Sequence, residues 1–464
     1  MLVLSLIVLP IAAGLVMLAL RRQNLAASRT AGAVIAAYTF AVAIAAQGQP
    51  WGEWSFRWLS RPFESSFHFG ATGISIWLVL LLATCTFCAV LATNVARSNQ
   101  FVGQLLILEG TMMGLFLARD LLVFALFWDL MLLPVFFTLI GWGQHHATAW
   151  RYFIYNFAGG LTLLLATAAF GVLYGSTDVI GRPDVHVIGS WVPWIFAGFA
   201  FAFLVKTPVW PLHTWMPLTY ADTPGPMVAV VSAVQSKAGL YGLIVIGLAL
   251  MPDYLRAYAP VLIVLGAISL LYGAFTALVQ TDAKRVVAYS SLSHLGLIVI
   301  AIAVMNTIAL QGAVIYIVAH GLFSAALFLI LGYFESREET RSLTRLGGLG
   351  AQNPRLAGAL TIAVLAALGL PGLAGFAGEI VILTGLYQAG WTWAVIVALV
   401  AIVLASAYAL RLLQGIINGP EIADLPVRPD LSWIEGVALA PLVVALVYIG
   451  VNPHMLTTFA GIMR

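Results

Sequence analysis

Long apolar runs repeat along almost the whole chain, and they constrain its fold more than any other feature. A helix of about 20 apolar residues crosses the hydrocarbon core of a bilayer. Of the 464 residues, 62% are hydrophobic and 8% are charged, whereas about a quarter are charged in soluble domains. We therefore predict an all-α, polytopic membrane protein with about 14 transmembrane helices and no nucleic-acid partner. The runs cover approximately residues 2–20, 29–47, 72–93, 102–118, 120–141, 153–174, 190–217, 224–249, 256–280, 284–305, 308–333, 355–388, 391–412 and 433–451.

The first run also predicts the orientation of the chain. No basic residue precedes residues 2–20, and Arg21 and Arg22 follow them, which is the reverse of a cleavable signal peptide. We expect a retained span. If the N-terminus is outside, the inner loops carry most of the basic loop residues, as the positive-inside rule requires. This predicts a multi-pass protein of the bacterial inner (plasma) membrane with both termini periplasmic. The inner loops would then carry Arg21, Arg22, Arg29, Arg97, Arg151, Lys284, Arg285, Arg337, Arg341, Arg345, Arg355, Arg411 and Arg428, and the outer side Arg57, Arg61, Arg119, Arg182, Arg256 and Arg464.

Two of the runs are interrupted by helix-breaking residues. The seventh contains "FLVKTPVWPLHTWMP" at 203–217, and the twelfth contains "GLPGLAGFAGE" at 369–379. Each holds one ionisable residue beside the interruption, Lys206 or Glu379. Paired interrupted helices at corresponding positions are a sequence sign of an inverted-repeat transporter. We expect a single membrane domain with two inverted five-helix repeats, helices 4–8 and 9–13. Its parts are three N-terminal helices in 1–100, the first repeat in 101–250, the second repeat in 251–412 and a C-terminal helix in 413–464.

Ionisable residues also lie near the middle of several predicted spans, where a charge is disfavoured. Such residues normally face the interior of a helix bundle and mark proton or ion routes. The alternative is a set of structural ion pairs, such as Asp129 with Lys206, that only hold helices together. Because these residues lie at similar depths on different helices, we favour a route that runs in the membrane plane. They are Glu109, Asp129, Lys206, Lys237, His294, His320 and Glu379.

The residue types suit proton transfer. Burial favours the neutral amine of a lysine and a nearby carboxylate favours the ammonium, so Lys206 and Lys237 can change protonation state as Asp129 moves. Arginine would stay charged. Imidazole exchanges protons near neutral pH, which suits His294 and His320 as intermediates. Unwound backbone at an interruption leaves polar groups that water can occupy; a plain proline kink is the alternative.

Other polar and aromatic features have simpler interpretations. Cys85 and Cys88 form a CxxC inside an apolar span without further ligands, so we expect two core residues and no metal or redox site. The inner loop at 335–355 is a solvated connector or a docking surface for a soluble partner. His213 and Asp222 are ordinary interfacial residues or a proton entrance. The outer loop before the third run has tryptophans that we expect to be interfacial anchors, Trp51, Trp54 and Trp58.

The motifs around these residues resemble one known family. The chain resembles the antiporter-like membrane subunits of the proton-pumping NADH-quinone oxidoreductase, respiratory complex I, and among them subunit M. In that family helix 12 carries glutamate in subunit M, as at Glu379, and lysine in subunits L and N. The chain also ends soon after helix 14, without the long lateral helix of subunit L. The matching stretches are "DLLVFALFWDLMLLPVFF" (120–137), "FLVKTPVWPLHTWMP" (203–217), "VQSKAGLYGLI" (234–244), "DAKRVVAYSSLSHLG" (282–296), "VAHGLFSAALFLILG" (318–332) and "GLPGLAGFAGEIVILTG" (369–385).

The resemblance implies one proton-translocation unit within about 14 core helices. The chain would act in an enzyme complex that couples NADH:quinone electron transfer to proton pumping. The resemblance also implies that FMN, iron-sulfur clusters and quinone are bound by partner subunits and that this chain holds no cofactor. Its partners would be the L- and N-type antiporter-like subunits, the lipid bilayer and protons. The proton-translocating residues carried over from the family are Asp129, Lys206, Lys237, His294, His320 and Glu379.

Two departures from the family pattern leave alternatives open. Helix 5 carries Asp129 where the family has glutamate, so contact with Lys206 requires a closer approach or a bridging water. "LTYADTPGP" at 218–226 replaces an acidic, histidine-rich run, which weakens a proton entrance at Asp222. The host complex is therefore the NADH-linked enzyme or a related redox-driven one. A Mrp-type cation/proton antiporter has the same helices and lysines, and a structural spacer is a further alternative. A redox enzyme in its own right is disfavoured because the chain lacks cofactor ligands.

Overall fold

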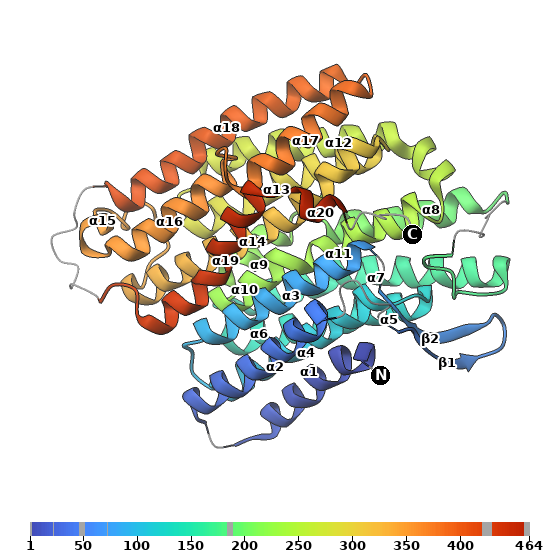
Figure 1. The fold of residues 1–464 in the computed structure, drawn as a ribbon, viewed down its shortest axis with the longest axis horizontal. Coiled ribbons are helices and arrows are strands. Elements are labelled where there is room, and N and C mark those ends of the chain that lie inside the picture. Colours follow the sequence, from blue (N-terminus) through green and yellow to red (C-terminus); the bar gives the residue numbers. More distant parts are fainter. Residues whose placement is uncertain are drawn as a thin grey trace. The chain divides into compact units, whose positions relative to one another are not determined.

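A computed structural model describes residues 2–21, 23–45, 52–71, 73–182, 189–419 and 429–458 of the chain (Figure 1). Within these ranges, twelve helices are long and apolar enough to cross a membrane. Two shorter apolar helices, Val192–Lys206 and Pro354–Ala367, belong to the interrupted seventh and twelfth runs. All predicted runs are therefore helical, and the predicted fold class is confirmed. Several residues used above lie outside the described ranges, namely Arg22, Trp51, Arg428 and Arg464.

The chain forms two compact units. The first is built mainly from Met1–Pro208 and Val234–Pro260, and the second from Val209–Ala233 and Val261–Thr457. The first boundary therefore falls in the interruption of the seventh run, the next two fall within the eighth and ninth runs, and the last lies between Thr457 and Thr458. The predicted inverted relation between two five-helix repeats is a separate matter and stays a prediction.

Glycine contacts bring the N-terminal helices of the first unit together. α1 (Leu2–Ala19) packs along α4 (Ser98–Leu117), and a Cβ on Gly14 would lie 2.6 Å from the carbonyl oxygen of Gly103. Small residues allow this approach between membrane helices, for which lipid provides no hydrophobic drive. The other elements of the unit are α2 (Leu25–Ala45), β1 (Trp54–Leu59), β2 (Ser65–Phe69), α3 (Gly73–Ala92), α5 (Leu121–Leu130), α6 (Leu132–Trp142), α7 (His146–Tyr174), α8 (Val192–Lys206), α11 (Lys237–Gly242) and η2 (Leu243–Leu248), while η1 (Val231–Gln235) and α12 (Pro252–Val279) belong partly to each unit.

The second unit is organised around α14 (Thr307–Glu338), which is buried along its membrane span. α17 (Ala374–Gln388) packs against α14 at glycines, and a Cβ on Gly312 would lie 2.6 Å from the backbone nitrogen of Ile382. α16 (Pro354–Ala367), α17 and α18 (Thr392–Ile417) lie side by side (Figure 1). The remaining elements are α9 (Met216–Asp222), α10 (Gly225–Val230), α13 (Ala283–Ala303), α15 (Leu349–Gln352), α19 (Trp433–Val451) and α20 (His454–Thr458).

The described part of the connection between α2 and α3 contains a β-hairpin, which the sequence did not predict. β1 and β2 pair antiparallel with Trp54 opposite Phe69, and these two rings stack with centroids 6.2 Å apart. The Trp58 indole nitrogen donates to the Ser65 hydroxyl at 2.9 Å. Aromatic residues favour strands because they pack well across a pleated surface. Trp54 and Trp58 therefore hold the hairpin together, and their interfacial anchoring stays a prediction.

Both predicted interruptions are present. Residues 207–215 separate α8 from α9, and residues 368–373 separate α16 from α17. Pro208 has no backbone N–H for the helical ladder, so α8 cannot continue through it. In the second interruption, Gly369 and Gly372 have φ of +76° and +92°, a conformation that residues with a Cβ rarely adopt. The alternative of a plain kink in a continuous helix is therefore wrong for both runs.

The eighth run is irregular in a way that the sequence did not reveal. The π-helical stretches η1 and η2 flank α11, and Lys237 is the first residue of α11. π-Helical turns are rare and frequently occur at functional sites. The fifth run is also divided, because α5 and α6 meet at Met131. Two of the predicted proton-transfer residues, Asp129 and Lys237, thus lie beside local irregularities.

Candidate functional site

The residues predicted to transfer protons are shared between the two units. Five of the six side chains are buried, and Asp129 is partly exposed. No group of three or more His, Cys, Asp or Glu side chains in the described part of the chain is arranged to hold a metal ion. The first unit contains Asp129, Lys206 and Lys237, and the second contains His294, His320 and Glu379.

Lys206 and Asp129 interact electrostatically without forming an ion pair. The Lys206 ammonium lies 5.1 Å from the centroid of the Trp128 ring, a distance at which a cation is attracted to the ring face. Within the described residues, neither Lys206 Nζ nor Asp129 Oδ1 has a hydrogen-bond partner, although each group influences the other electrostatically. The alternative of a structural Asp129–Lys206 ion pair is therefore wrong in this conformation. A buried charge without a direct partner is costly, which favours transient protonation or hydration here.

Gly160 determines where the Asp129 carboxylate lies. A Cβ on Gly160 of α7 would be only 1.8 Å from Asp129 Oδ1, so the carboxylate occupies the space of the missing side chain. Lys206 is the last residue of α8, where unpaired carbonyls and the helix dipole favour a cation. The Asp129 carboxylate thus packs against α7, while Lys206 lies at the C-terminal end of α8, next to the interruption.

Lys237 is held close to the end of α8. A Cβ on Gly239 would lie 2.2 Å from the Thr207 hydroxyl oxygen, so α11 and the end of α8 approach closely. Lys237 Nζ donates to the Ser236 hydroxyl at 3.3 Å. Cys85 of α3 lies within electrostatic range of Lys237. Cys85 and Cys88 are both buried and carry free thiols, as predicted for core residues.

The second unit brings its three predicted residues together with two tyrosines. The rings of His294 and His320 lie 5.6 Å apart at 83°. The Tyr316 hydroxyl donates to Glu379 Oε1 at 2.6 Å, and the Tyr408 hydroxyl lies 3.3 Å from His294 Nε2. Sequence reasoning missed both tyrosines. Tyr316 lies one helical turn before His320, a spacing that places both on the same face of α14 and that offered a signal.

Glu109 contacts a different part of the first unit. Its side chain is fully buried in α4, and the Thr39 hydroxyl of α2 donates to Oε1 at 2.7 Å. The Thr39 hydroxyl is also 2.9 Å from the Ala36 carbonyl oxygen. Glu109 therefore links α4 to α2, and a role in proton transfer stays a prediction.

The C-terminal end of the seventh run is tied to the segment around Arg341 by an ionic cluster, the Arg341 cluster. Arg341 lies 3.3 Å from Asp282 and 3.9 Å from Asp222 at the end of α9. Lys284 donates to the Thr223 carbonyl oxygen at 3.1 Å. The start of the 335–355 loop is therefore packed against its own chain, which corrects the expectation of a solvated connector there. The cluster consists of Asp222, Asp282, Lys284, Glu335 and Arg341.

His213 lies within the interruption and is also packed. Its ring is 5.0 Å from that of Tyr272, and the side chain is buried. The simple interfacial interpretation is therefore wrong for His213. Its use as a proton entrance stays a prediction, as does that of Asp222.

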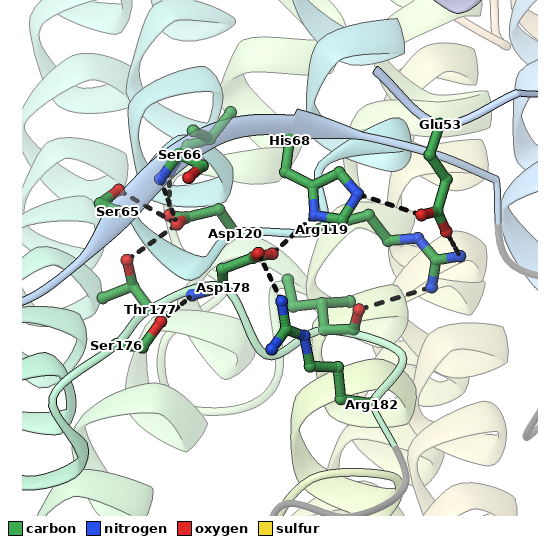
Figure 2. A network of polar contacts seen from close by, with 12 residues as sticks. Glu53, Ser65, Ser66, His68, Arg119, Asp120, Ser176, Thr177, Asp178 and Arg182 are labelled. Carbon is green, nitrogen blue, oxygen red and sulfur yellow. Dashed lines mark hydrogen bonds and ion pairs between the residues drawn. The ribbon is translucent and has the colours of Figure 1, made fainter. Parts of the chain in front are cut away.

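A polar network fastens the hairpin to the start of α5 (Figure 2). Asp120 caps α5 by accepting from the backbone nitrogens of Leu122 at 2.8 Å and Val123 at 3.2 Å. The same carboxylate accepts from the Ser65 hydroxyl of β2 and from the Thr177 hydroxyl. A carboxylate at the N-terminus of a helix satisfies free N–H groups and complements the dipole. The helix that carries Asp129 is thus anchored at its far end.

His68 is the titratable centre of this network. Its Nδ1 lies 2.7 Å from Asp178 Oδ1 and its Nε2 lies 3.5 Å from Glu53 Oε2, while Arg119 pairs with Glu53 at 3.1 Å. The hydrogen bond to Asp178 raises the pKa of His68, and burial and Arg119 oppose that rise. A neighbouring carboxylate favours the imidazolium. Figure 2 shows His68 between Glu53 and Asp178.

Taken separately, each unit contains groups that can hold and release protons inside an apolar helix bundle. The first pairs a lysine at an interruption with a carboxylate that it does not touch. The second places two imidazoles beside hydroxyl groups and a carboxyl at the other interruption. No sequence-predicted residue of the six is displaced to a solvated loop, since all six lie on the helices expected to carry them.

Comparisons with known proteins agree with this architecture. Residues 118–405 match the family described as NADH:quinone oxidoreductase/Mrp antiporter, TM. NADH-quinone oxidoreductase subunit M of Rhodobacter capsulatus is 32% identical over 416 residues, which cover 85% of this chain and 80% of the relative. The Pseudomonas aeruginosa subunit M is 34% identical over 440 residues, covering 89% and 85%. A chain of respiratory complex I from Thermus thermophilus superposes with a TM-score of 0.88 at 29% identity and full coverage of both chains. The chain belongs to the NADH:quinone oxidoreductase/Mrp antiporter transmembrane family.

Proposed function

We propose that this chain is the M-type antiporter-like subunit of an NADH-quinone oxidoreductase and that it translocates protons. The relatives named subunit M extend over most of its length. The observation that carries the proposal is the set of buried proton-exchanging groups, which include two lysines, at and beside interrupted helices. Groups of this kind are disfavoured in an apolar bundle unless they serve transport.

In this proposal Lys206 is the first switchable carrier. Approach of the Asp129 carboxylate stabilises the ammonium, and withdrawal releases the proton. Two unit charges 4 Å apart interact by about 4 kcal/mol at an effective dielectric constant of about 20. Moving one charge against 100 mV requires about 2.3 kcal/mol. A change in the Asp129–Lys206 separation can therefore change their interaction energy by enough to move one proton against 100 mV.

Protons would then pass from Lys206 to Lys237, on to His294 and His320, and leave through Glu379. The interruptions would supply the hydration, since unwound backbone offers unpaired polar groups. Partner subunits would carry FMN, the iron-sulfur clusters and the quinone chemistry, and the L- and N-type subunits would be neighbours in the membrane. We propose the bacterial plasma membrane as the location, with both termini on the periplasmic side.

The test uses the assembled complex in proteoliposomes with NADH and quinone. Lys206→Ala and Glu379→Ala should reduce proton pumping per NADH while the complex still assembles. Arg256→Ala is the control, because this arginine is 73% exposed and, among the described residues, pairs only with Asp253, which is 88% exposed, at 3.7 Å. Full pumping in both assembled variants would refute the proposal in favour of a structural spacer.

A Mrp-type cation/proton antiporter is the second candidate, because the family description names it. It is powered by an ion gradient and needs no redox partners. Purification of the chain from its native membrane would distinguish the two. Recovery of NADH-oxidising activity with the chain supports the first function, and recovery of cation/proton exchange without redox subunits supports the second.

A further inference from the structure

The carboxyl of Glu379 is fixed between two structural features of the second unit. On one side is α14, which approaches α17 so closely that a Cβ on Gly378 would lie 2.7 Å from the Cβ of Tyr316. The absence of a side chain at Gly378 therefore lets the Tyr316 ring pack against the α17 backbone. From there its hydroxyl donates to Glu379 Oε1 at 2.6 Å. This oxygen is held by a buried, neutral donor.

The other carboxyl oxygen points to the interruption between α16 and α17. A Cβ on Gly369 would lie 2.3 Å from Glu379 Oε2, so this oxygen occupies the space beside the bare Cα. Gly369 has a φ of +76° and its neighbour Leu370 is 42% exposed. Within the described residues, Oε2 accepts no hydrogen bond from a side chain or backbone group. The two oxygens of one carboxyl thus differ in their surroundings.

The histidine side of the site has a matching hydroxyl. His294 Nε2 lies 3.3 Å from the Tyr408 hydroxyl, and the His294 ring is 5.8 Å from the Tyr316 ring. Tyr316 therefore stands between the histidines and the carboxyl, and its hydroxyl proton is already committed to Oε1. A proton that reaches Glu379 has only Oε2 as an unoccupied acceptor.

We propose that the Tyr316 hydroxyl and the bare Cα of Gly369 fix Glu379 in one orientation, so that only Oε2 exchanges protons, at the interruption in helix 12. This inference rests on the proposed function. Tyr316 is then a positioning residue: it keeps its own proton, and the transferred proton binds to and leaves from Oε2. A hydrogen bond to a charged acceptor is among the stronger ones in proteins, and its orientation is correspondingly well defined.

Two pairs of variants in the assembled complex test the proposal. Tyr316→Phe removes the hydroxyl and keeps the ring, and Tyr258→Phe is its control, because that hydroxyl donates to the Pro193 carbonyl oxygen at 3.4 Å in the first unit. Gly369→Ala puts a methyl group against Oε2. Gly372→Ala is its control, since Gly372 has a φ of +92° but its Cβ would meet nothing within 4 Å. Both alanines therefore carry left-handed backbone strain, and only one displaces the carboxyl.

Two measurements are made on each variant in proteoliposomes. The first is proton pumping per NADH, and the second is the infrared C=O stretching band of the protonated carboxyl, identified by its loss in Glu379→Gln. Tyr316→Phe should move this band to higher frequency, because the carboxyl loses its donor, and should lower pumping about tenfold or more. Gly369→Ala should change both quantities more than Gly372→Ala, which carries the same backbone strain without contacting the carboxyl. Tyr258→Phe should leave both quantities as in the unmodified complex.

The outcomes separate this inference from the proposed function. An unchanged band and unchanged pumping in assembled Tyr316→Phe would overturn the inference, as would equal effects of Gly369→Ala and Gly372→Ala. If Glu379→Gln itself pumps normally, the proposed function is wrong as well. If Glu379→Gln loses pumping while Tyr316→Phe changes neither the band nor pumping, the proposed function stands and only the proposed fixed orientation of Glu379 is refuted.

Discussion

Replacement of His68 by glutamine should loosen the β-hairpin in a pH-dependent manner. Glutamine keeps a polar side chain of similar size but cannot become charged. His68 is the titratable group among those that join β2 to the 176–182 connection, through the 2.7 Å contact with Asp178. The charged groups that face the imidazole are Asp178, Glu53 and Arg119. Among the described residues, His68 is the titratable group that contacts both Asp178 and Glu53, and the variant removes its charge.

The magnitude follows from the contact with Asp178. A hydrogen bond between charged partners contributes about 1.5–3 kcal/mol when buried. The His68 and Asp178 side chains are 14% and 17% exposed, so partial screening reduces the expected contribution to about 1–2 kcal/mol. This corresponds to about 5- to 30-fold in the population of the open hairpin.

The sign of the pH dependence is set by the raised pKa of His68, which the hydrogen bond to Asp178 causes. The stabilisation is fully present below the unfolded value of about 6.5 and is lost as the pH rises through the higher folded value. The unmodified hairpin should therefore be better protected at about pH 6 than at about pH 8.5. His68→Gln should be weakly protected at both.

Hydrogen exchange of the assembled complex measures this protection. The reporting amides are those of Arg119, which donates to the His68 carbonyl at 2.9 Å, and Gly70, which donates to the Leu117 carbonyl at 2.8 Å. Arg57→Ala is the matched control, because its 3.6 Å pair with Glu64 lies in the same hairpin and is 67% and 54% exposed. Such exposed pairs contribute little. Equal protection of His68→Gln and the unmodified protein at about pH 6 would refute this reasoning.

Three further substitutions address the helices. Lys206→Arg should abolish proton pumping without loss of assembly, because a guanidinium does not release its proton at physiological pH; pumping measured in proteoliposomes at the unmodified rate would contradict this. Gly160→Ala should lower pumping about tenfold or more, since its Cβ would lie 1.8 Å from Asp129 Oδ1 and small misplacements of reacting groups have large effects. Gly358→Ala in α16, whose Cβ would meet nothing within 4 Å, is the control and should pump normally. Arg341→Ala should lower the thermal stability of the chain by about 1–3 kcal/mol, because it leaves partly buried carboxylates unpaired; an unchanged melting temperature would contradict the role of the Arg341 cluster.

The sequence predicted the membrane helices because their signal is local. Whether a segment spans a bilayer depends on its own length and apolarity, so the run at 72–93 predicted α3, and the run at 433–451 predicted α19, to within a few residues. The interruptions were also predictable, since Pro208 and Gly369 act on the backbone around themselves. The identity of the buried ionisable residues followed from their depth in these runs.

Contacts between helices could not be predicted from the sequence, and the reason is physical. Helix rotation and approach depend on glycines of distant segments: Gly160 places Asp129 against α7, and Gly378 admits the ring of Tyr316. Whether Asp129 and Lys206 pair directly could not be read from their own segments, because nothing in the runs at 120–141 and 190–217 specifies that α7 leaves room for the carboxylate. The apolar pattern thus determined how many helices this protein has and where they break, whereas close packing between helices decided which proton-carrying side chains meet.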